Sequence, residues 1–569
     1  MGSQRIVDIG IQSFEQLRER NAFYVDKTNF IKDWWLNGAN ATLITRPRRF
    51  GKTLNLSMLE CFFSNKYAGR AELFKGLSIW NEEEFRNLQG AYPVIFLSFA
   101  RVKATDYEEM EYAITKIIFD AYEQNRYLLE GDFLSEKEKK YFESIEPGMG
   151  KKVAVDAVNA LTNFISRYYD SHVIILLDEY DTPMQEAWLS GYWDEAVHFF
   201  RSFFNATFKS NPYMLRGLIT GITRISKESI FPDLNNLEVI TTTSKKYAPY
   251  FGFTEPEVFK ALNDMGFSGE KQGVKKWYDG FTFGDIADIY NPWSISSFIG
   301  NGAAYKSYWA DTSSNGLVNR LIREGSGELK QNFERLLRGE HVVMPIDEQV
   351  VYDQLDEDEN AVWSLLLAGG YLKVVSMDNS HIGDSLDEVR YELALTNHEV
   401  RRMFAKMIRG WFSGRSKTGY NEFIKALLED NVKKMNTFMN KVALDTFSFF
   451  DTGKRPSEDT EPKRFYHGFV LGMAVDLADR YRVKSNRESG YGRYDVMMTP
   501  FDKRDKGFIF EFKVLDKDEN EQSLEETVAN ARAQIEAKGY EAELIADGVL
   551  PENIRKYGFA FEGKMCLIG

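Results

Sequence analysis

The feature that most constrains the fold is the apolar run VIILL at residues 173–177, which ends at Asp178 and Glu179. A strand of this kind is apolar on both faces, so it has to be covered on both sides, like the central strands of parallel sheets. Helical stretches separate it from other short apolar segments, which lie at 41–45, 93–99 and 215–220. Strands that alternate with helices predict a three-layer α/β domain with a mostly parallel sheet.

The first apolar segment runs directly into TRPRRFGKT at residues 45–53. Its last three residues, Gly51, Lys52 and Thr53, end the segment as a phosphate-binding loop usually ends. Such a loop gathers backbone N–H groups around the phosphates at a helix N-terminus. Lys52 would then contact the β- and γ-phosphates and Thr53 would hold Mg²⁺. The residues after the loop have helical spacing, so the strand, loop and helix occur in the required order.

A nucleotide site of this kind also needs a carboxylate at the end of a neighbouring strand, and Asp178 fits that role. Glu179 would orient or deprotonate the attacking water. Asp181 fits a turn or a helix cap better than a further ligand. The loop is unusual because Arg46 stands where its first glycine is expected, and the following Pro47 favours an extended backbone there.

Two further arginines, Arg48 and Arg49, lie within the loop. One of them is expected to reach phosphate or the acidic pair at 178–179, and the other to form an ion pair on the surface. The sequence leaves open which arginine does which.

Several separated motifs resemble the AAA-ATPase-like family of bacterial and archaeal proteins. They are YVDKT (24–28), ITRPRRFGKTLNLSML (44–59), LLDEYDTP (176–183), GITRIS (221–226), FGFT (251–254), KKWYDGFTFG (275–284) and YNPWS (290–294). The resemblance spans residues 20–300 and makes RPRRFGKT a family feature. It implies an ATP- and Mg²⁺-dependent enzyme in which Thr220 and Arg224 sense the γ-phosphate. Arg224 would complete the transition-state charge, and its alternative role is a surface ion pair at a helix start.

A second group of chemically active residues lies on a hairpin whose polar turn is DKRDKG, at 502–507. Glu511 and Lys513 would point to one face of its second strand, opposite an aromatic face. Folding the hairpin about residues 503–504 brings Asp495 opposite Glu511. The two carboxylates can then hold one or two Mg²⁺ ions while Lys513 orients water. An ordinary amphipathic hairpin with a cross-strand salt bridge is the alternative.

The pattern Asp495…Glu511-Phe512-Lys513 resembles the PD-(D/E)XK nuclease signature, although Tyr494 replaces its proline. Three flanking segments also resemble the nuclease domain that often follows this ATPase domain: RFYHGFVLGM (464–473), SNRESGYGRYDVMM (485–498) and ARAQIEAKGY (531–540). The resemblance covers 460–565 and implies phosphodiester cleavage with Mg²⁺ or Mn²⁺. It also implies a place for Gln534 near the lysine. Glu488, as a further acid, and His467 are weaker candidates.

The sequence therefore predicts three regions: an AAA-like P-loop ATPase domain (1–245), a helical or winged-helix-like lid or linker region (246–450) and an α/β nuclease-like domain (451–569). The C-terminal region should run helix (465–483), strand (493–499), strand (508–514) and helix (523–538).

Composition restricts the partners and the location. A net charge of −14 and a pI of about 5.2 argue against binding nucleic acid through bulk charge, so such binding would need a local basic patch. Two cysteines, Cys61 and Cys566, exclude a disulfide framework and a cysteine-based zinc module. No secretory leader or membrane span is recognised, so we expect a cytoplasmic protein with no membrane partner.

These features together predict an Mg²⁺-dependent ATPase whose nucleotide state controls a C-terminal nuclease acting on DNA or RNA. By association with this architecture alone, its context would be defence or genome maintenance. The alternative is a nucleotide-switched binding or signalling protein with a non-cleaving nuclease-like domain. A remodelling motor fits less well, because no arginine that must act across a subunit boundary is identified. The sequence leaves open whether the chain forms a homo-oligomer.

Overall fold

The computed structural model describes residues 6–209, 211–225, 230–231, 235–310, 316–348, 352, 355, 358–378, 389–411, 417–450, 461–489, 492–515, 521–562 and 565–569. The chain divides into two compact units. The first contains Met1–Ser313 and Val343–Val400, and the second contains Ser314–Val342 and Arg401–Gly569. Residues 246–450 contribute to both units, and the region boundaries at 245 and 450 remain predictions.

The first unit is built on a five-stranded parallel sheet of order β2-β3-β4-β1-β5. Its strands are β1 (Ala41–Thr45), β2 (Val94–Ser98), β3 (Val173–Asp178), β4 (Met214–Gly221) and β5 (Leu237–Ile240). Every residue of β1 and β3 is buried, because helices cover both faces of the sheet. The predicted three-layer α/β fold is confirmed.

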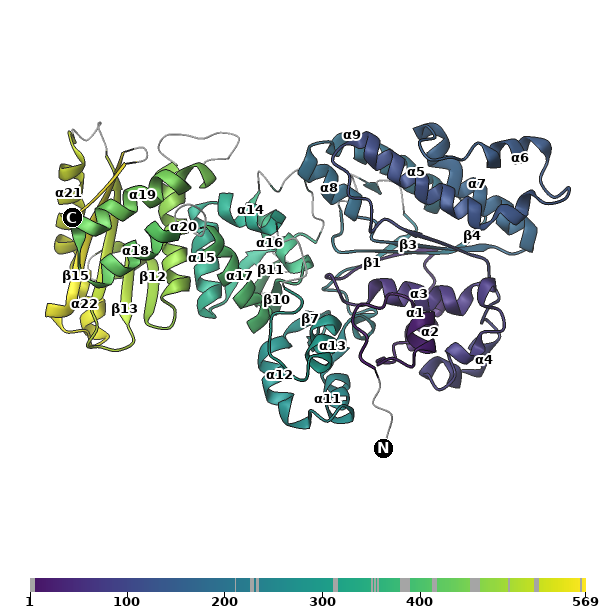
Figure 1. Ribbon diagram of the computed structural model, residues 1–569, viewed down its shortest axis with the longest axis horizontal. Helices are drawn as coiled ribbons and strands as arrows, with labels where there is room; N and C mark the ends of the chain where they lie inside the picture. Colours follow the sequence, from purple (N-terminus) through teal and green to yellow (C-terminus); the bar gives the residue numbers. More distant parts are fainter. Residues whose placement is uncertain are drawn as a thin grey trace. The chain divides into compact units, whose positions relative to one another are not determined.

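Figure 1 shows α5, α7, α8 and α9 on one side of this sheet and α1–α4 on the other. The bounds of these helices and of α6 are α1 (Phe14–Glu19), α2 (Asn29–Leu36), α3 (Lys52–Phe63), α4 (Glu83–Arg86), α5 (Tyr107–Gln124), α6 (Glu136–Glu143), α7 (Lys151–Tyr169), α8 (Thr182–Ser190) and α9 (Trp193–Phe204). Leu56, Leu59 and Phe63 of α3 are all buried, as their helical spacing predicts.

The strand order corrects one expectation about the acidic strand. β3 does not lie beside β1, because β4 is inserted between the two and pairs in parallel with both. The carboxyl ends of parallel strands nevertheless meet at one edge, where sites in such sheets form. Asp178 at the end of β3 and the loop after β1 therefore still face the same edge. β5 is a short strand at the edge of the sheet and was not predicted from the sequence.

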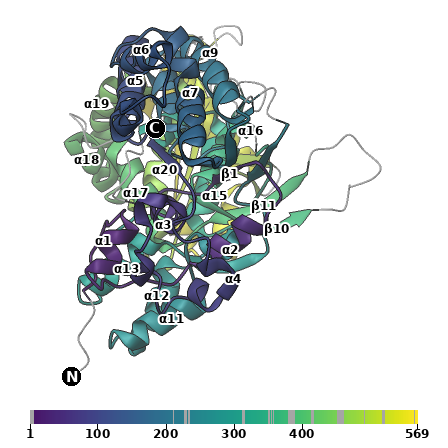
Figure 2. The ribbon, with the colours of Figure 1, turned by 90° about the vertical axis from the view of Figure 1, so that its right-hand side faces the viewer.

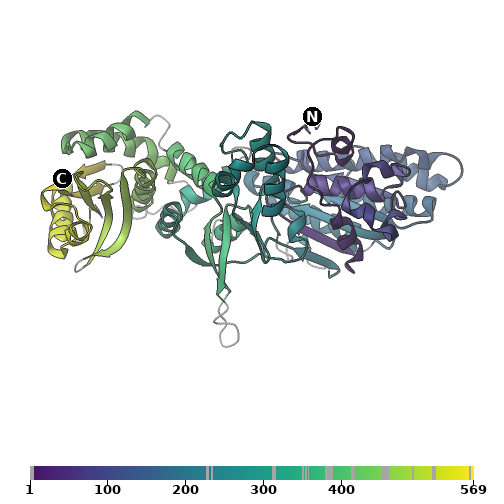
Figure 3. The ribbon, with the colours of Figure 1, turned by 90° about the horizontal axis from the view of Figure 1, so that it is seen from below.

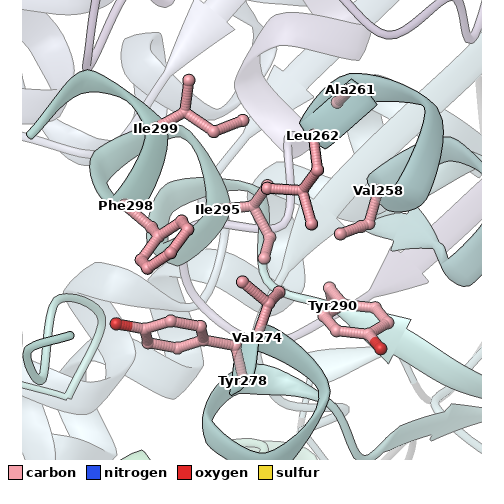
Figure 4. Packing of buried hydrophobic residues seen from close by; sticks show 9 residues of the cluster. All are labelled: Val258, Ala261, Leu262, Val274, Tyr278, Tyr290, Ile295, Phe298 and Ile299. Atoms are coloured by element: carbon pink, nitrogen blue, oxygen red, sulfur yellow. The ribbon is translucent and has the colours of Figure 1, made fainter. Parts of the chain in front are cut away.

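Residues after 250 form strands as well as helices, in addition to the expected helical content. β6 (Phe253–Thr254), β8 (Ile286–Tyr290) and β7 (Phe281–Phe283) make an antiparallel sheet, beside α11 (Glu255–Asp264), α12 (Lys271–Tyr278) and α13 (Pro292–Gly300). Aromatic and aliphatic side chains from these elements pack into one buried cluster, shown in Figure 4. α13 begins where Asn291 accepts hydrogen bonds from two backbone N–H groups and Pro292 takes the first helical position.

The rest of the first unit contains α16 (Glu359–Ala368) and strands of a small sheet of order β10-β11-β9. Its strands are β9 (Val342–Pro345), β10 (Leu372–Asp378) and β11 (Arg390–Leu395), and Figure 2 shows β10 and β11 side by side as an antiparallel ribbon. Across the described parts of the chain, no helix is both long enough and apolar enough to cross a membrane.

The second unit holds a mixed sheet of order β12-β13-β14-β15-β16, in which only β14 and β15 pair in parallel. Its strands are β12 (Tyr481–Ser489), β13 (Gly492–Pro500), β14 (Gly507–Val514), β15 (Ile554–Glu562) and β16 (Met565–Ile568). Its helices are α14 (Gly316–Glu324), α15 (Gly327–Arg338), α18 (Lys417–Leu428), α19 (Val432–Phe450), α20 (Glu461–Asp476), α21 (Leu524–Lys538) and α22 (Glu541–Ala546). α17 (His398–Trp411) begins in the first unit and ends in the second.

Helices cover both faces of this second sheet, and Figure 3 shows its strands beside the green and yellow helices. Phe512 stacks on Tyr466 of α20, with ring centroids 4.9 Å apart. Its neighbour Glu511 faces α21 on the other side. The helix predicted for 465–483 is too long, because α20 ends at Asp476 and the polar strand β12 begins at Tyr481.

Shortening Phe298 tests the cluster of Figure 4. The Phe298 side chain of α13 is fully buried and packs toward α12 in this cluster. Phe298→Ala should therefore leave a cavity and lower the free energy of unfolding by ~3–5 kcal/mol. Urea unfolding followed by circular dichroism measures this change. Leu36→Ala, at a side chain that is 66% exposed, is the control and should change stability little. Equal urea midpoints for the two variants would contradict the packing.

Candidate nucleotide and nuclease sites

At the carboxyl edge of the parallel sheet, the Asp178 carboxylate joins three elements. Its two oxygens accept hydrogen bonds from the hydroxyls of Thr53, at 2.7 Å, and Thr220, at 2.6 Å. Thr53 lies in the first turn of α3, and Thr220 lies near the end of β4. Burial raises the pKa of Asp178, and the two hydroxyl donors oppose this rise. The carboxylate therefore fixes the position of the loop helix relative to β3 and β4.

Lys52 lies inside the loop, where its ammonium donates to the carbonyl oxygens of Arg46 and Pro47, both at 2.9 Å. Burial lowers the pKa of Lys52, while the carboxylates of Glu179 and Asp178 raise it. The preceding Gly51 has a left-handed φ of 81° at the N-cap of α3, where no side chain caps the helix among the described residues. The loop thus offers a positive charge and a helix N-terminus at one place, which is the pattern that binds phosphate.

The Arg46 side chain points away from the Lys52 ammonium and serves the packing of the fold. Its guanidinium is fully buried, donates to the carbonyl oxygens of Thr45 and Thr241, and lies 4.8 Å from the centre of the Phe283 ring. Burial lowers the pKa of Arg46 to about 9. Its backbone N–H still bonds to the Gly221 carbonyl at 3.1 Å, so the chain stays extended along β4 at the position where glycine is usual.

The other two loop arginines occupy different environments. Arg48 donates to the side-chain oxygen of Gln185 on α8 at 3.2 Å, and its charge helps to lower the pKa of Lys52. Arg49 is exposed, has a left-handed φ of 67°, and places its guanidinium 4.2 Å from the centre of the Trp293 ring. Arg48 therefore lies beside the acidic edge, and Arg49 lies on the surface against an aromatic ring.

The residues after β3 shape the rest of this edge. Glu179 has a left-handed φ of 52°, and its carboxylate accepts a hydrogen bond from the Thr182 hydroxyl at 3.2 Å. Asp181 occupies the N-cap position of α8 but makes no capping bond. One of its oxygens instead accepts from the N–H groups of Ile222 and Thr223 and from the Thr223 hydroxyl. Of the two roles expected for Asp181, a turn or a helix cap, the side chain takes the first: it fixes the turn after β4.

Gly221 is required at the start of this turn. A β-carbon added there would lie 2.6 Å from the Tyr180 ring and 2.7 Å from the Asp181 carboxylate. Arg224 follows the turn. Its positive charge lowers the pKa of the Tyr180 phenol, which burial raises. Tyr352, much later in the chain, donates to or accepts from the Thr223 hydroxyl at 3.2 Å. No local sequence pattern indicates Tyr352, because a residue this distant is brought in only by the fold.

In the second unit, the predicted pairing of the hairpin strands is confirmed. Val496 pairs with Phe510, so Asp495 is next in register to Glu511, as expected for a fold about residues 503–504. The Asp495 carboxylate accepts a hydrogen bond from the Phe512 N–H at 2.7 Å. Both acidic side chains therefore lie on the face that carries α21. The side chains of Glu488 and His467 lie outside the described residues.

Glu511 is a buried acid of this face, and its pKa is raised. Its side chain is buried, one carboxylate oxygen accepts from the Gln534 amide of α21, and the other has no hydrogen-bond partner among the described residues. Burial, with the nearby Asp495 charge, raises the pKa of Glu511 to about 8, while Lys513 lowers it. A buried carboxylate oxygen without a donor, beside a second carboxylate, is the environment that a divalent cation would complete. The residues present fit a metal site.

A group of three carboxylates elsewhere, Glu255, Asp279 and Asp288, also has a spacing that could hold a metal ion. The Lys275 ammonium lies 2.5 Å from Glu255 and 3.3 Å from Asp288. The Lys275 ammonium therefore already offsets part of the negative charge of this group.

Comparison with known proteins assigns both sites to domains. Residues 8–231 match the family described as "Predicted AAA-ATPase", and residues 461–569 match the "PD-(D/E)XK nuclease superfamily". The chain therefore contains a predicted AAA-ATPase domain followed by a domain of the PD-(D/E)XK nuclease superfamily. Both resemblances stated from the sequence are confirmed.

One relative is a protein of Azotobacter chroococcum mcd 1 described as "Uncharacterized protein in vnfD 5'region". It is 25% identical over 406 residues, which cover 70% of this chain and 69% of the relative. One solved structure is that of the Aeropyrum pernix ORC2 protein in ADPNP–ADP complexes, at 11% identity and a TM-score of 0.21, covering 69% of this chain and 93% of that one. At that score, the ORC2 likeness supports no conclusion about this chain.

The raised pKa of Glu511 predicts a pH-dependent stability in the metal-free protein. Between its ordinary value of 4.5 and about 8, the folded state keeps a proton that the unfolded state releases. Stability from this group is therefore complete below the ordinary value and is lost as the pH rises through about 8. Glu511→Gln should match the wild type at acidic pH and melt a few degrees higher at alkaline pH.

Thermal unfolding in the presence of a chelator, at pH values from about 5 to about 9, measures this difference. Glu525→Gln, at an exposed position of α21, is the control and should show a constant offset. A constant offset for Glu511→Gln as well would contradict the raised pKa.

Proposed function

We propose that the first unit binds and hydrolyses ATP with Mg²⁺. The observation that carries this proposal is the Asp178 carboxylate, which joins Thr53 and Thr220 beside the buried Lys52 ammonium. A lysine, a first-turn hydroxyl and a strand-end carboxylate are the groups that P-loop enzymes use for phosphate and metal. Their convergence on one sheet edge supports the same use here.

Each residue has a defined part in this proposal. When ATP binds, the Lys52 ammonium releases a loop carbonyl oxygen and donates to phosphate oxygens instead. Thr53 and Asp178 hold the metal ion. When bound, Mg²⁺ supplies neutralising charge at the β- and γ-phosphates. Glu179 orients or deprotonates the attacking water. The remaining binding residues are Arg48, Arg49, Gly51, Thr220 and Arg224. Of the two loop arginines, Arg48 is the better placed to reach phosphate, because Arg49 stacks on Trp293.

For the second unit, we propose metal-dependent cleavage of DNA or RNA. Asp495 and Glu511 would hold Mg²⁺ or Mn²⁺, which would stabilise negative charge on the phosphodiester. Lys513 would orient the attacking water, and Gln534 would position Glu511 through the hydrogen bond that joins them. The unpartnered Glu511 oxygen supports this assignment, because a metal ion would satisfy it.

We further propose that the nucleotide state of the first unit controls the nuclease, in defence or genome maintenance. Helix α17 is continuous across the division of the chain, since residues 398–400 belong to the first unit and 401–411 to the second. The second candidate function is a nucleotide-switched binding or signalling protein that does not cut. The net charge of −14 favours this candidate, because it weakens the general attraction for nucleic acid.

The nucleotide site is tested by Lys52→Ala. Removing the ammonium should weaken ATP binding at least tenfold, by about 1.4 kcal/mol or more, because the phosphate charge loses its cation. Isothermal titration calorimetry measures this loss. The control is Lys260→Ala, at a side chain that is 77% exposed on α11. Wild-type affinity in the Lys52→Ala protein would exclude the phosphate-loop assignment.

The nuclease site is tested by Glu511→Ala and Lys513→Ala. Each should remove metal-dependent cleavage of mixed DNA and RNA substrates, assayed with Mg²⁺ or Mn²⁺ and with or without ATP. ATP hydrolysis should remain, because these residues belong to the other unit. Glu525→Ala should cut as the wild type does. Absence of cleavage by the wild-type protein under every condition would favour the non-cleaving alternative.

A further inference from the structure

The phosphate loop turns one of its carbonyl groups away from the others. The carbonyl oxygens of Arg46 and Pro47 face the Lys52 ammonium inside the loop. The carbonyl oxygen of Arg48 instead accepts a hydrogen bond from the Trp309 indole N–H, at 3.0 Å, and one from the Asn291 amide, at 3.3 Å. These donors lie 261 and 243 positions further along the chain.

This arrangement fixes the direction of the next N–H group. In a trans peptide, the carbonyl and the following N–H point in opposite directions within one plane. Holding the Arg48 carbonyl toward Trp309 and Asn291 therefore aims the Arg49 N–H the opposite way. The left-handed φ values of Arg49, 67°, and Gly51, 81°, turn the chain twice within three residues. Turns of this kind gather N–H groups into a concave binding site for anions.

Neighbouring contacts hold the same part of the loop. The Phe50 ring packs against Phe281 and Phe283, with centroids 4.7 and 5.2 Å apart. The Arg49 guanidinium lies over Trp293. Three consecutive loop residues are thus attached to the segment 281–309, through a carbonyl, a cation and an aromatic ring.

Both donors are themselves fixed in place. Trp309 is 2% exposed, and its backbone N–H donates to the buried Glu399 carboxylate at 2.6 Å. The other Glu399 oxygen accepts from the Ser294 hydroxyl at 2.9 Å. Asn291 is 1% exposed and uses its side-chain oxygen to cap α13, which leaves its amide N–H directed at Arg48. The two donors are therefore held before any ligand binds.

We propose that Trp309 and Asn291 are positioning residues for nucleotide binding, because they hold the Arg48 carbonyl outward and direct the Arg49 N–H toward the phosphates. This inference rests on the proposed nucleotide site in the first unit. It adds that phosphate affinity depends on two hydrogen bonds supplied by a distant segment of the chain. Neither residue contacts the ligand.

Two conservative substitutions remove one donor each. Trp309→Phe keeps a ring against Phe281 and Tyr371 but loses the N–H. Asn291→Asp keeps the oxygen that caps α13 but loses the amide donor. Each should weaken ATP binding and raise the KM for ATP about 5- to 20-fold, with kcat within about twofold, because the loop contacts ground state and transition state alike. Calorimetry and steady-state ATPase assays on the full chain measure these changes.

Trp277→Phe is the matched control, since it makes the same change on α12 and should bind ATP as the wild type does. Wild-type affinity and KM in both test variants would overturn the inference. The inference would also be overturned if the nucleotide-free variants melted at so much lower a temperature that partial unfolding explained their weaker ATP binding. Lys52→Ala is measured in parallel: if it too binds ATP normally, the proposed function itself fails. If only Lys52→Ala loses ATP, the inference alone fails.

Discussion

The first unit depends on one buried carboxylate. Asp178 ends a strand that is apolar on both faces, and both of its oxygens accept hydroxyl hydrogen bonds, from the loop helix and from β4. Burying a carboxylate is unfavourable unless hydrogen bonds compensate it, so the two threonines are as necessary as the acid. A parallel sheet brings these groups together because the carboxyl ends of its strands share one edge. The site is therefore a consequence of strand order and of three short polar side chains.

The two candidate sites differ in how many of their carboxylate oxygens accept a hydrogen bond. Asp178 has a donor on each oxygen, whereas Glu511 has one oxygen bonded to Gln534 and one without a partner in the described part of the chain. Burial raises the pKa of both groups. The acid of the first site is therefore already fully hydrogen-bonded, whereas the acid of the second has one oxygen that the proposed metal ion would satisfy.

Much of both sites was predictable where the signal is local. The apolar run at 173–177, the GKT ending and the alternation around Glu511 follow from periodicity and chain order. Trp309, Asn291 and Tyr352 were not predictable, because they bond to backbone atoms or hydroxyls that only the fold brings near. β12 was missed because its residues after Tyr481 and Val483 are polar and do not continue an apolar alternation. A turn and a helix cap both remained open for Asp181, because chain position does not reveal which N–H groups a carboxylate meets.

The buried guanidinium of Arg46 has a consequence for how the loop works. A glycine at this position would leave the chain many conformations in the absence of ligand. An arginine enclosed by aromatic rings and bonded to two carbonyls removes that freedom. Ordering a loop on binding reduces affinity, so a loop that is already rigid loses little entropy when phosphate arrives. In the proposed phosphate site, the same rigidity would favour phosphate over anions of another shape.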